Sequence, residues 1–381
     1  MTADGSRVSG RLVLADRVAR GTISIEDGQI AGIDEDGREV ARPEAAGAEL
    51  PLIAPGFIDV HVHGWGGHDA MGGRDALDGM ARALLPHGVT SFLPTGYTQP
   101  WAKIVEFADV ARAWLRDPPA DGAQPLGYNL EGPFVAPARK GAHEPSLLRT
   151  PAEIGIDAIA GVLDGLRVMT VAPELPGALE LISWLSERGV AASIGHSAAT
   201  LTQAQAAYAA GGTTTTHLFN AMSGVDHHAP GLAVAALTDD SVYVELIADG
   251  HHVDRSLWPI ITRTKPADRL LLVSDAIPLA GMGDGRAHIG GLEVEVVDGR
   301  VTLVGTTTLA GSVIALDTAV RNLAASGVSL SAAVAAASAN PATMLGVTDR
   351  GRIEIGQRAD LVELDDDLRV RRVMRGGRWV T

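Results

Sequence analysis

A short apolar run followed by a helical stretch recurs eight times in the middle of the chain, and this repeat constrains the fold more than any other feature. The runs read FIDVHVHG, TSFLPTG, LGYNLEGPF, RVMTVAPE, VAASIGHS, TTTTHLFNAM, VYVELIADG and RLLLVSDA, beginning near Phe57, Thr90, Leu126, Arg167, Val190, Thr213, Val242 and Arg269. Amphipathic stretches such as ALDGMARALLPHG and LTQAQAAYAAGG lie between them. Eight strands alternating with helices, about 20–40 residues apart, predict an α/β fold of the (β/α)8 TIM-barrel type. An open doubly wound sheet is the alternative, but it usually carries fewer strands and a glycine fingerprint that this chain lacks.

The two ends of the chain have a different pattern from the middle. Residues 8–34 and 350–380 alternate apolar and polar positions between turn signals such as DG and AD. This alternation is typical of short antiparallel strands. We therefore expect a small β-sandwich domain built from residues 1–53 together with 349–381, and a catalytic barrel over 54–348.

Charge and composition exclude several classes of function. The net charge of −15 argues against nucleic acid or an anionic membrane as a partner. The chain has no cysteine, so disulfides and thiolate metal sites are excluded. The first residues lack the pattern of a signal peptide, and no run of about 18 apolar residues predicts a transmembrane helix. We expect a cytoplasmic protein.

Side chains that can bind metals follow the apolar runs at the point where each run ends. They are His61, His63, Glu131, His196, His217 and Asp275. The carboxyl ends of the strands form the catalytic face of a (β/α)8 barrel, so these six side chains are expected to converge. The two histidines of the first run lie two positions apart and point the same way on a strand. One such residue alone is often structural, but six together favour a shared metal site.

The donor set narrows the metal and the reaction. With only nitrogen and oxygen donors, Zn²⁺, Fe²⁺, Mn²⁺ and Co²⁺ all fit. Such an ion lowers the pKa of a bound water and polarises a carbonyl oxygen. Asp275 is placed to take the proton of that water and pass it to a leaving nitrogen. The sequence therefore predicts hydrolysis of an amide or a related C–N bond.

Several motifs together resemble one enzyme family. PGFIDVHVHGWGGHD, NLEGPF, KGAH, IGHSAAT, THLFNAMS, ADGHHVD, VSDAIPLAG, TLAGS and NPATMLG occur in this order. The ordered set resembles the N-acetylglucosamine-6-phosphate deacetylases of the amidohydrolase superfamily, from near Leu50 to the C-terminal strands. The resemblance implies a barrel with a small β-sandwich, usually a homodimer. It implies removal of acetate from a small-molecule amino-sugar phosphate in amino-sugar catabolism.

The resemblance also implies a principal metal site. Glu131, His196 and His217 match the residues that hold the principal divalent metal in the family. Many relatives in the wider superfamily bridge two metals with a modified lysine, and Glu131 takes that place here. Lys140 lies in the following loop and is not expected to bridge.

A second metal is implied for some family members only. His61 and His63 match the pair that these members use, together with Asp275, for a second ion. Other members lack the pair and work with one metal. We therefore expect one or two ions per subunit.

Substrate contacts come from three further motifs. His143 in KGAH matches the residue that reaches the sugar and polarises the acetyl carbonyl. Asn220 and Ala221 match the segment that approaches the phosphate, and His252 in ADGHHVD matches a histidine that contacts it. The loop GPFVAPARKGAHEP, residues 132–145, is rich in Gly, Pro and small residues, and is expected to act as a lid unless it is an ordinary surface loop.

One departure from the family leaves the substrate open. His228 stands where the family commonly has an arginine that reaches the phosphate in the partner subunit, and histidine lacks the two-pronged fork of arginine. His227, Arg139 or Lys140 would have to compensate, or the substrate is different. The alternatives are the galactosamine epimer or an unphosphorylated sugar. More distant ones are a cyclic-amide or N-acyl-amino-acid hydrolase and a non-catalytic scaffold on the same barrel.

Overall fold

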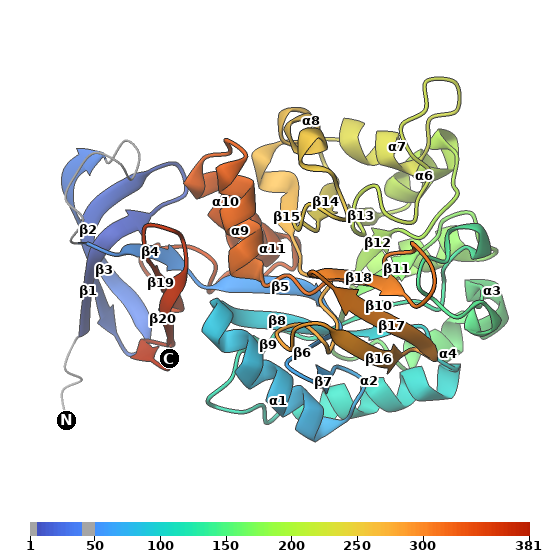
Figure 1. Cartoon of the computed structure of the whole chain (residues 1–381), viewed down its shortest axis with the longest axis horizontal. Helices are drawn as coiled ribbons and strands as arrows, with labels where there is room; N and C mark the ends of the chain where they lie inside the picture. Colours follow the sequence, from blue (N-terminus) through green and yellow to red (C-terminus); the bar gives the residue numbers. More distant parts are fainter. Residues whose placement is uncertain (1–5, 40–49) are drawn as a thin grey trace.

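Eight parallel strands form the barrel that the repeat predicts, in a computed structural model that describes residues 6–39 and 50–381 (Figure 1). In spatial order they are β15 (Leu270–Leu272), β14 (Tyr243–Leu246), β13 (Gly212–Thr215), β12 (Ala191–Ile194), β11 (Leu166–Val171), β10 (Tyr128–Glu131), β8 (Val89–Tyr97) and β5 (Phe57–Val62). A short strand β9 (Gln124–Pro125) pairs with β8. The segment after β15 meets the end of β5, because Asp275 N donates to His61 O at 2.8 Å. Each predicted run overlaps one of the eight strands, and the barrel prediction is confirmed.

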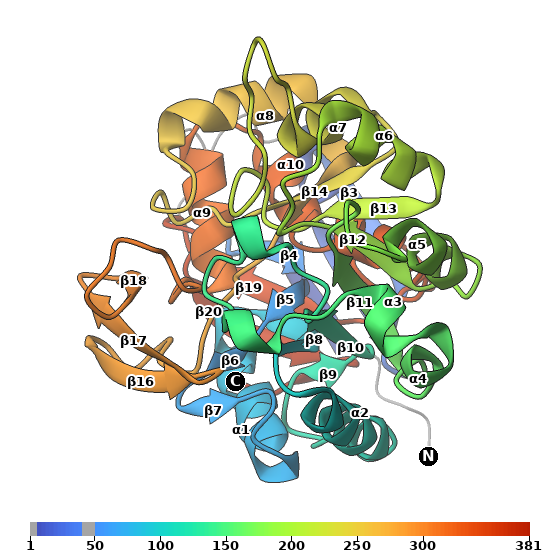
Figure 2. The ribbon, with the colours of Figure 1, turned by 90° about the vertical axis from the view of Figure 1, so that its right-hand side faces the viewer.

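Helices surround the barrel (Figure 2). They are α1 (Arg74–Leu84), α2 (Trp101–Leu115), α3 (Pro151–Ile154), α4 (Ile156–Ala160), α5 (Ala178–Ser186), α6 (Leu201–Ala209), α7 (Leu232–Thr238), α8 (Trp258–Thr264), α9 (Leu316–Ala325), α10 (Leu330–Ala336) and α11 (Ala339–Met344). Helix α1 buries Leu77, Met80, Ala81 and Leu84, which share one helical face. A capping box of Thr200 and Gln203 begins α6. Within residues 6–39 and 50–381, no helix has the length and apolar character needed to cross a bilayer.

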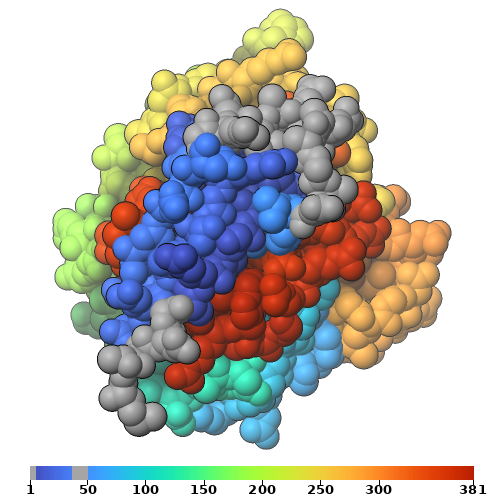
Figure 3. Space-filling view, turned by 90° about the vertical axis from the view of Figure 1, so that its left-hand side faces the viewer, coloured from blue at the N-terminus to red at the C-terminus, as the bar shows by residue number. Residues whose placement is uncertain are grey.

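Both ends of the chain build one seven-stranded sheet beside the barrel. Its order is β21 (Arg378–Trp379), β20 (Val370–Arg375), β19 (Leu361–Leu364), β4 (Leu52–Pro55), β1 (Ser6–Val13), β2 (Val18–Glu26) and β3 (Gln29–Glu39). Figure 3 shows the first strands in blue and the last in red side by side on one face. The sheet has its own core, which includes Leu12, Ile23, Ile53 and Leu361. Residues 1–5 and 40–49 of the predicted small domain lie outside the described residues, and we keep its boundaries at residues 53 and 349 as a proposal.

A small antiparallel sheet beside the open end of the barrel was not predicted. It consists of β16 (Gly285–Ile289), β17 (Leu292–Val297) and β18 (Arg300–Leu303), and a further pair, β6 (Gly64–Trp65) and β7 (His68–Asp69), lies nearby. Val294, Val296 and Val301 pack with Ile277 and Ala310 into a separate apolar cluster. The sequence contains the signals for this sheet, since GG and DG turns separate alternating segments at 290–291 and 298–299.

Gly56 joins the terminal sheet to the barrel at a point without room for a side chain. A Cβ atom there would lie 2.2 Å from Thr90 Oγ1 and 2.5 Å from Thr90 Cγ2. Thr90 is buried and fixed in the barrel. We expect Gly56→Ala to lower the free energy of unfolding by about 1–3 kcal/mol, the usual cost of overpacking. Urea denaturation followed by circular dichroism measures this change.

Two companion variants test the cause of that loss. Removing the Thr90 hydroxyl and methyl groups in Gly56→Ala/Thr90→Ala should recover part of the stability, because these two groups make the closest contacts. Gly32→Ala is the matched control, since the nearest atom to its Cβ would be 3.8 Å away. A loss in Gly56→Ala no larger than that in Gly32→Ala would contradict the packing argument.

Candidate active site

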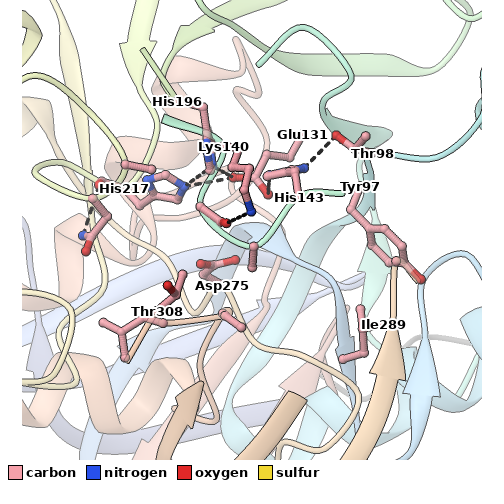
Figure 4. Close-up of a pocket in the computed structure, with 18 of the residues that line it drawn as sticks. Tyr97, Thr98, Glu131, Lys140, His143, His196, His217, Asp275, Ile289 and Thr308 are labelled. Atoms are coloured by element: carbon pink, nitrogen blue, oxygen red, sulfur yellow. Dashed lines mark hydrogen bonds and ion pairs between the residues drawn. The ribbon is translucent and has the colours of Figure 1, made fainter. Parts of the chain in front are cut away.

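Six metal-competent side chains converge at the carboxyl end of the barrel. Each follows or ends a strand, and each is no more than 6% exposed: His61 and His63 from β5, Glu131 from β10, His196 after β12, His217 after β13 and Asp275 after β15. Residues far apart in sequence, such as His61 and Asp275, thus share one buried cluster because parallel barrel strands end on the same face. Figure 4 shows several of them pointing toward a common centre.

Glu131 lies at the middle of this cluster. Its Oε1 atom is 2.9 Å from His217 Nε2 and 3.0 Å from His196 Nε2. Its Oε2 atom is 3.2 Å from His63 Nε2. Asp275 Oδ1 lies 3.1 Å from the same His63 nitrogen. One carboxylate therefore contacts both histidine pairs and links them.

The outer nitrogens of two rings fix how those rings are protonated. His63 Nδ1 lies 3.0 Å from Thr95 O, and His196 Nδ1 lies 2.9 Å from Arg139 O. A carbonyl oxygen only accepts hydrogen bonds, so each Nδ1 donates. Each Nε2 of a neutral ring then directs a lone pair into the cluster, which is how metal-binding histidines are commonly oriented.

Glu245 helps to position the other two histidines, His61 and His217. Its Oε2 atom is 3.0 Å from His61 Nδ1 and accepts the backbone N–H of His217 at 3.1 Å. Glu245 is fully buried on β14. One carboxylate oxygen therefore holds the ring of His61 and the backbone of His217, one residue from each histidine pair.

The inner nitrogens lie closer together than neutral rings tolerate without a cation. Nε2 of His196 is 3.0 Å from Nε2 of His217, and Nε2 of His61 is 3.3 Å from Nε2 of His63. Facing lone pairs at these distances repel unless a proton or a metal lies between them. Two groups of donor atoms have the separations that a metal ion needs. One comprises His61, His63, Glu131 and Asp275, and the other comprises Glu131, His143 and His196. The residues present fit a divalent metal centre.

Without a metal, protons replace the positive charge. Burial alone would lower the pKa of His63, but Asp275 and Glu131 outweigh it and raise this pKa to about 9. Against the same burial, Glu131 and Asp275 also raise the pKa of His61. Burial lowers the pKa of His196 to about 4, which leaves that ring neutral. The histidines hold the pKa of Glu131 well below its usual range despite burial.

These shifts predict how a metal affects stability at different pH. The raised pKa of His63 stabilises the metal-free fold fully below the unfolded value of 6.5, and this stability is lost as pH rises through about 9. A metal must displace the same proton, so metal affinity increases over that interval. We expect the rise in Tm caused by Zn²⁺ to grow from pH 6.5 to pH 9. Calorimetry with and without the ion measures it, and an equal rise at both ends would contradict the argument.

Three of the donors leave their strands on a strained backbone. His196, His217 and Asp275 have φ angles of 47°, 29° and 50°, in the left-handed region that side-chain-bearing residues seldom adopt. The surrounding hydrogen bonds impose it, including Asp275 N to His61 O at 2.8 Å. Such strain is concentrated at functional sites.

A cavity of about 600 Å³ opens above the cluster. Among its lining residues are the predicted substrate contacts His143, Asn220, Ala221 and His252. His143 Nδ1 pairs with Thr98 Oγ1 at 2.7 Å, and its Nε2 lies 3.6 Å from Glu131 Oε2. The structure therefore places His143 directly beside the cluster.

The other predicted contact, His228, lies elsewhere. It is exposed on the loop between Ser223 and Pro230, its ring 3.9 Å from that of His227, and it does not line the cavity. Arg139 and Lys140 do line it. The arginine and lysine that line the cavity of the described chain thus both come from the 132–145 loop.

The amidohydrolase family model matches residues 52–380. The chain belongs to the amidohydrolase family. A deacetylase of N-acetylgalactosamine 6-phosphate from Escherichia coli O157:H7 is 40% identical over 92% of both chains. The human N-acetylglucosamine-6-phosphate deacetylase is 40% identical over 86% of this chain and 83% of its own. The predicted family resemblance is confirmed.

Solved structures agree with these relatives. The N-acetylglucosamine-6-phosphate deacetylase of Thermotoga maritima superposes with a TM-score of 0.90 at 33% identity, over 99% of each chain. A mutant of the Mycobacterium smegmatis enzyme in complex with N-acetyl-D-glucosamine 6-phosphate superposes with a TM-score of 0.89 at 35% identity, also over 99% of each chain. The described part of this amidohydrolase therefore has the fold of the deacetylases in both the barrel and the terminal sheet.

Several residues of this amidohydrolase site were not predicted from the sequence, among them Glu245, Thr98 and Tyr97. Glu245 is an acid flanked on both sides by apolar residues in the run VYVELIADG, a signal that could have marked it as a buried partner. Thr98, which contacts His143, has no such signal because a threonine at a strand end is common. Tyr97 lines the cavity beside His63, with ring centroids 5.9 Å apart.

Proposed function

We propose that the chain is a metal-dependent deacetylase that converts N-acetyl-D-glucosamine 6-phosphate into D-glucosamine 6-phosphate and acetate. The observation that carries this proposal is the convergence of Glu131 with four histidines and Asp275 beneath one cavity, in a chain of the amidohydrolase family. Relatives of 40% identity and a relative's complex with this sugar phosphate support the substrate.

The metal centre is proposed in two parts. Glu131, His196 and His217 would hold the principal ion, and His61 and His63 with Asp275 a second one. Zn²⁺, Fe²⁺, Mn²⁺ or Co²⁺ suits these nitrogen and oxygen donors. When bound, such an ion polarises the amide carbonyl and lowers the pKa of a water.

The chain's own residues move the protons. Asp275 accepts the proton of the attacking water and delivers it to the amine as the C–N bond breaks. Its position 3.1 Å from His63 Nε2 supports this role, since it places the carboxylate at the cluster. His143 stabilises the negative charge that develops on the carbonyl oxygen. Thr98 orients His143 through the contact to Nδ1.

The phosphate would lie on the side of the cavity where polar groups gather. Asn220, Ala221 and His252 line the cavity, as do the basic Arg139 and Lys140. We further propose a cytoplasmic homodimer in which the exposed His228 of each subunit approaches the cavity of the other.

The galactosamine epimer is the second candidate substrate. It is favoured by the Escherichia coli relative, which has 40% identity over 92% of both chains and is a deacetylase of N-acetylgalactosamine 6-phosphate. The two substrates share the reacting amide and the phosphate, and differ only in the configuration of one hydroxyl group.

Acetate release from three substrates tests the proposal. N-acetylglucosamine 6-phosphate, its galactosamine epimer and unphosphorylated N-acetylglucosamine are compared with defined metal added. We expect kcat/KM for the first to exceed that for the neutral sugar at least about a hundredfold, because charge-assisted contacts to a phosphate are strong. Preference for the epimer would support the second candidate, and equal rates with the neutral sugar would contradict the phosphate assignment.

A further inference from the structure

One side of the cavity is lined by large apolar side chains. Tyr97, Ile277 and Ile289 line it, and we refer to these three as the apolar wall. In Figure 4, Tyr97 and Ile289 lie on one side of Asp275, whereas His217 and Thr308 lie on the other. The wall therefore lies next to the metal-competent cluster, on the side of the cavity opposite His217.

Tyr97 contributes ring surface and not a reactive hydroxyl. Its Oη donates to Asp69 Oδ2 at 2.8 Å. Burial, followed by the charge of Asp69, raises the pKa of this phenol above its usual value. The ring lies edge-on to His63 at 5.9 Å between centroids. Because the hydroxyl is committed to Asp69, the side chain offers apolar contact right beside the cluster.

The small sheet closes this side of the cavity. Ile289 ends β16, and Gly290 in the following turn lies so close to Tyr97 that a Cβ would be 3.3 Å from the ring. Ile277 and Val294 anchor the sheet through their shared apolar cluster, on which Ile289 also packs. The wall is thus held in place by the packing of the small sheet and by the hydrogen bond of Tyr97 to Asp69.

The polarity of the cavity orients a substrate with a charged sugar and an apolar acyl group. The scissile amide must lie at the cluster, between the two sides. Asn220 belongs to the His217 side, because its Nδ2 donates to His217 O at 3.2 Å. A phosphorylated sugar on the amine therefore extends toward that side, and the acyl group on the carbonyl carbon extends toward the wall.

We propose that Tyr97, Ile277 and Ile289 form the acyl subsite, and that it also accepts N-acyl groups one or two carbons longer than acetyl. This inference rests on the proposed function. The reaction stays a hydrolysis: the C–N bond breaks, water adds OH to the acyl carbon and H to the amine, and a short carboxylate leaves. The three side chains line a cavity of about 600 Å³, within the usual 300–1,000 Å³ of ligand sites, so the wall faces open volume and not packed protein.

Acyl-chain profiles of three variants test the subsite. Values of kcat/KM are measured for N-acetyl-, N-propionyl- and N-butyryl-glucosamine 6-phosphate with metal-loaded enzyme. We expect measurable turnover of the longer chains by the wild type, and a butyryl-to-acetyl ratio about tenfold higher in Ile289→Ala, from the burial of two added CH₂ groups. Ile289→Phe should lower that ratio. Val297→Ala is the control, because Val297 is 55% exposed on the same sheet and does not line the cavity.

Inhibition by the amine product tests whether the wall contacts the acyl group or the sugar ring. Glucosamine 6-phosphate lacks the acyl group, so its inhibition constant should be the same in the wild type and Ile289→Ala. Weakened inhibition in Ile289→Ala would mean that the wall holds the sugar ring, and an acyl profile equal to that of Val297→Ala would likewise overturn the subsite. Acetyl hydrolysis without these shifts leaves the proposed function intact, whereas no acetate release at all refutes both.

Discussion

Replacing Asp275 with Asn is expected to reduce kcat about a thousandfold, within the range attributed to a positioned general acid–base group. The amide of Asn keeps the size of the side chain but cannot take up a proton from water at neutral pH. The principal metal should stay bound, because Glu131, His196 and His217 are unchanged. Acetate release and metal content of the purified variant are measured together.

A second, partly buried carboxylate gives the control for this loss. Asp69 lies near the cavity, where its Oδ2 accepts from the Tyr97 hydroxyl at 2.8 Å, but it is not among the converging donors. Asp69→Asn should keep its activity within about tenfold of the wild type, since it removes no group that transfers protons. If Asp275→Asn retains as much activity as Asp69→Asn, the proton-transfer role is wrong.

The barrel and the cluster could be predicted because both depend on local pattern plus one general rule. Most barrel strands are runs of apolar residues, and β13 (GTTT) is rich in β-branched threonine, so all eight were visible in the sequence. His61, Glu131 and Asp275 stand at strand ends, and the rule that these ends share one face brings them together. The convergence of these side chains could therefore be predicted without three-dimensional information.

Contacts that depend on tertiary packing could not be predicted in this way. Glu245 holds His61 from 184 residues away, and nothing local in the sequence pairs them. The wall residue Ile289 acquires its position only because the small sheet folds back over the cavity. His228 lies on an exposed loop, so its own chain does not reveal what it approaches.

Glu131→Gln should have the largest effect on metal binding. The carboxylate oxygens contact His196 and His217 on one side and His63 on the other. An amide removes the charge and turns an N–H₂ donor toward these nitrogens. We expect metal affinity to fall by more than about a hundredfold, which exceeds the usual loss when a hydrogen-bond partner of a metal ligand is removed. The activity should fall with the metal affinity. Metal titration by calorimetry measures the affinity.

The metal-free form gives an independent readout of the same substitution. The histidines hold the pKa of Glu131 far below its usual range, so its ionised form stabilises the fold at neutral pH, and this contribution is lost as the pH falls. The Tm of metal-free Glu131→Gln should therefore be lower than that of the wild type at pH 7, with a smaller difference in acid. Glu144→Gln is the matched control, since Glu144 lines the same cavity but caps a short helical turn through Ser146 N. Metal affinity equal in the two variants would show that Glu131 does not hold the ion.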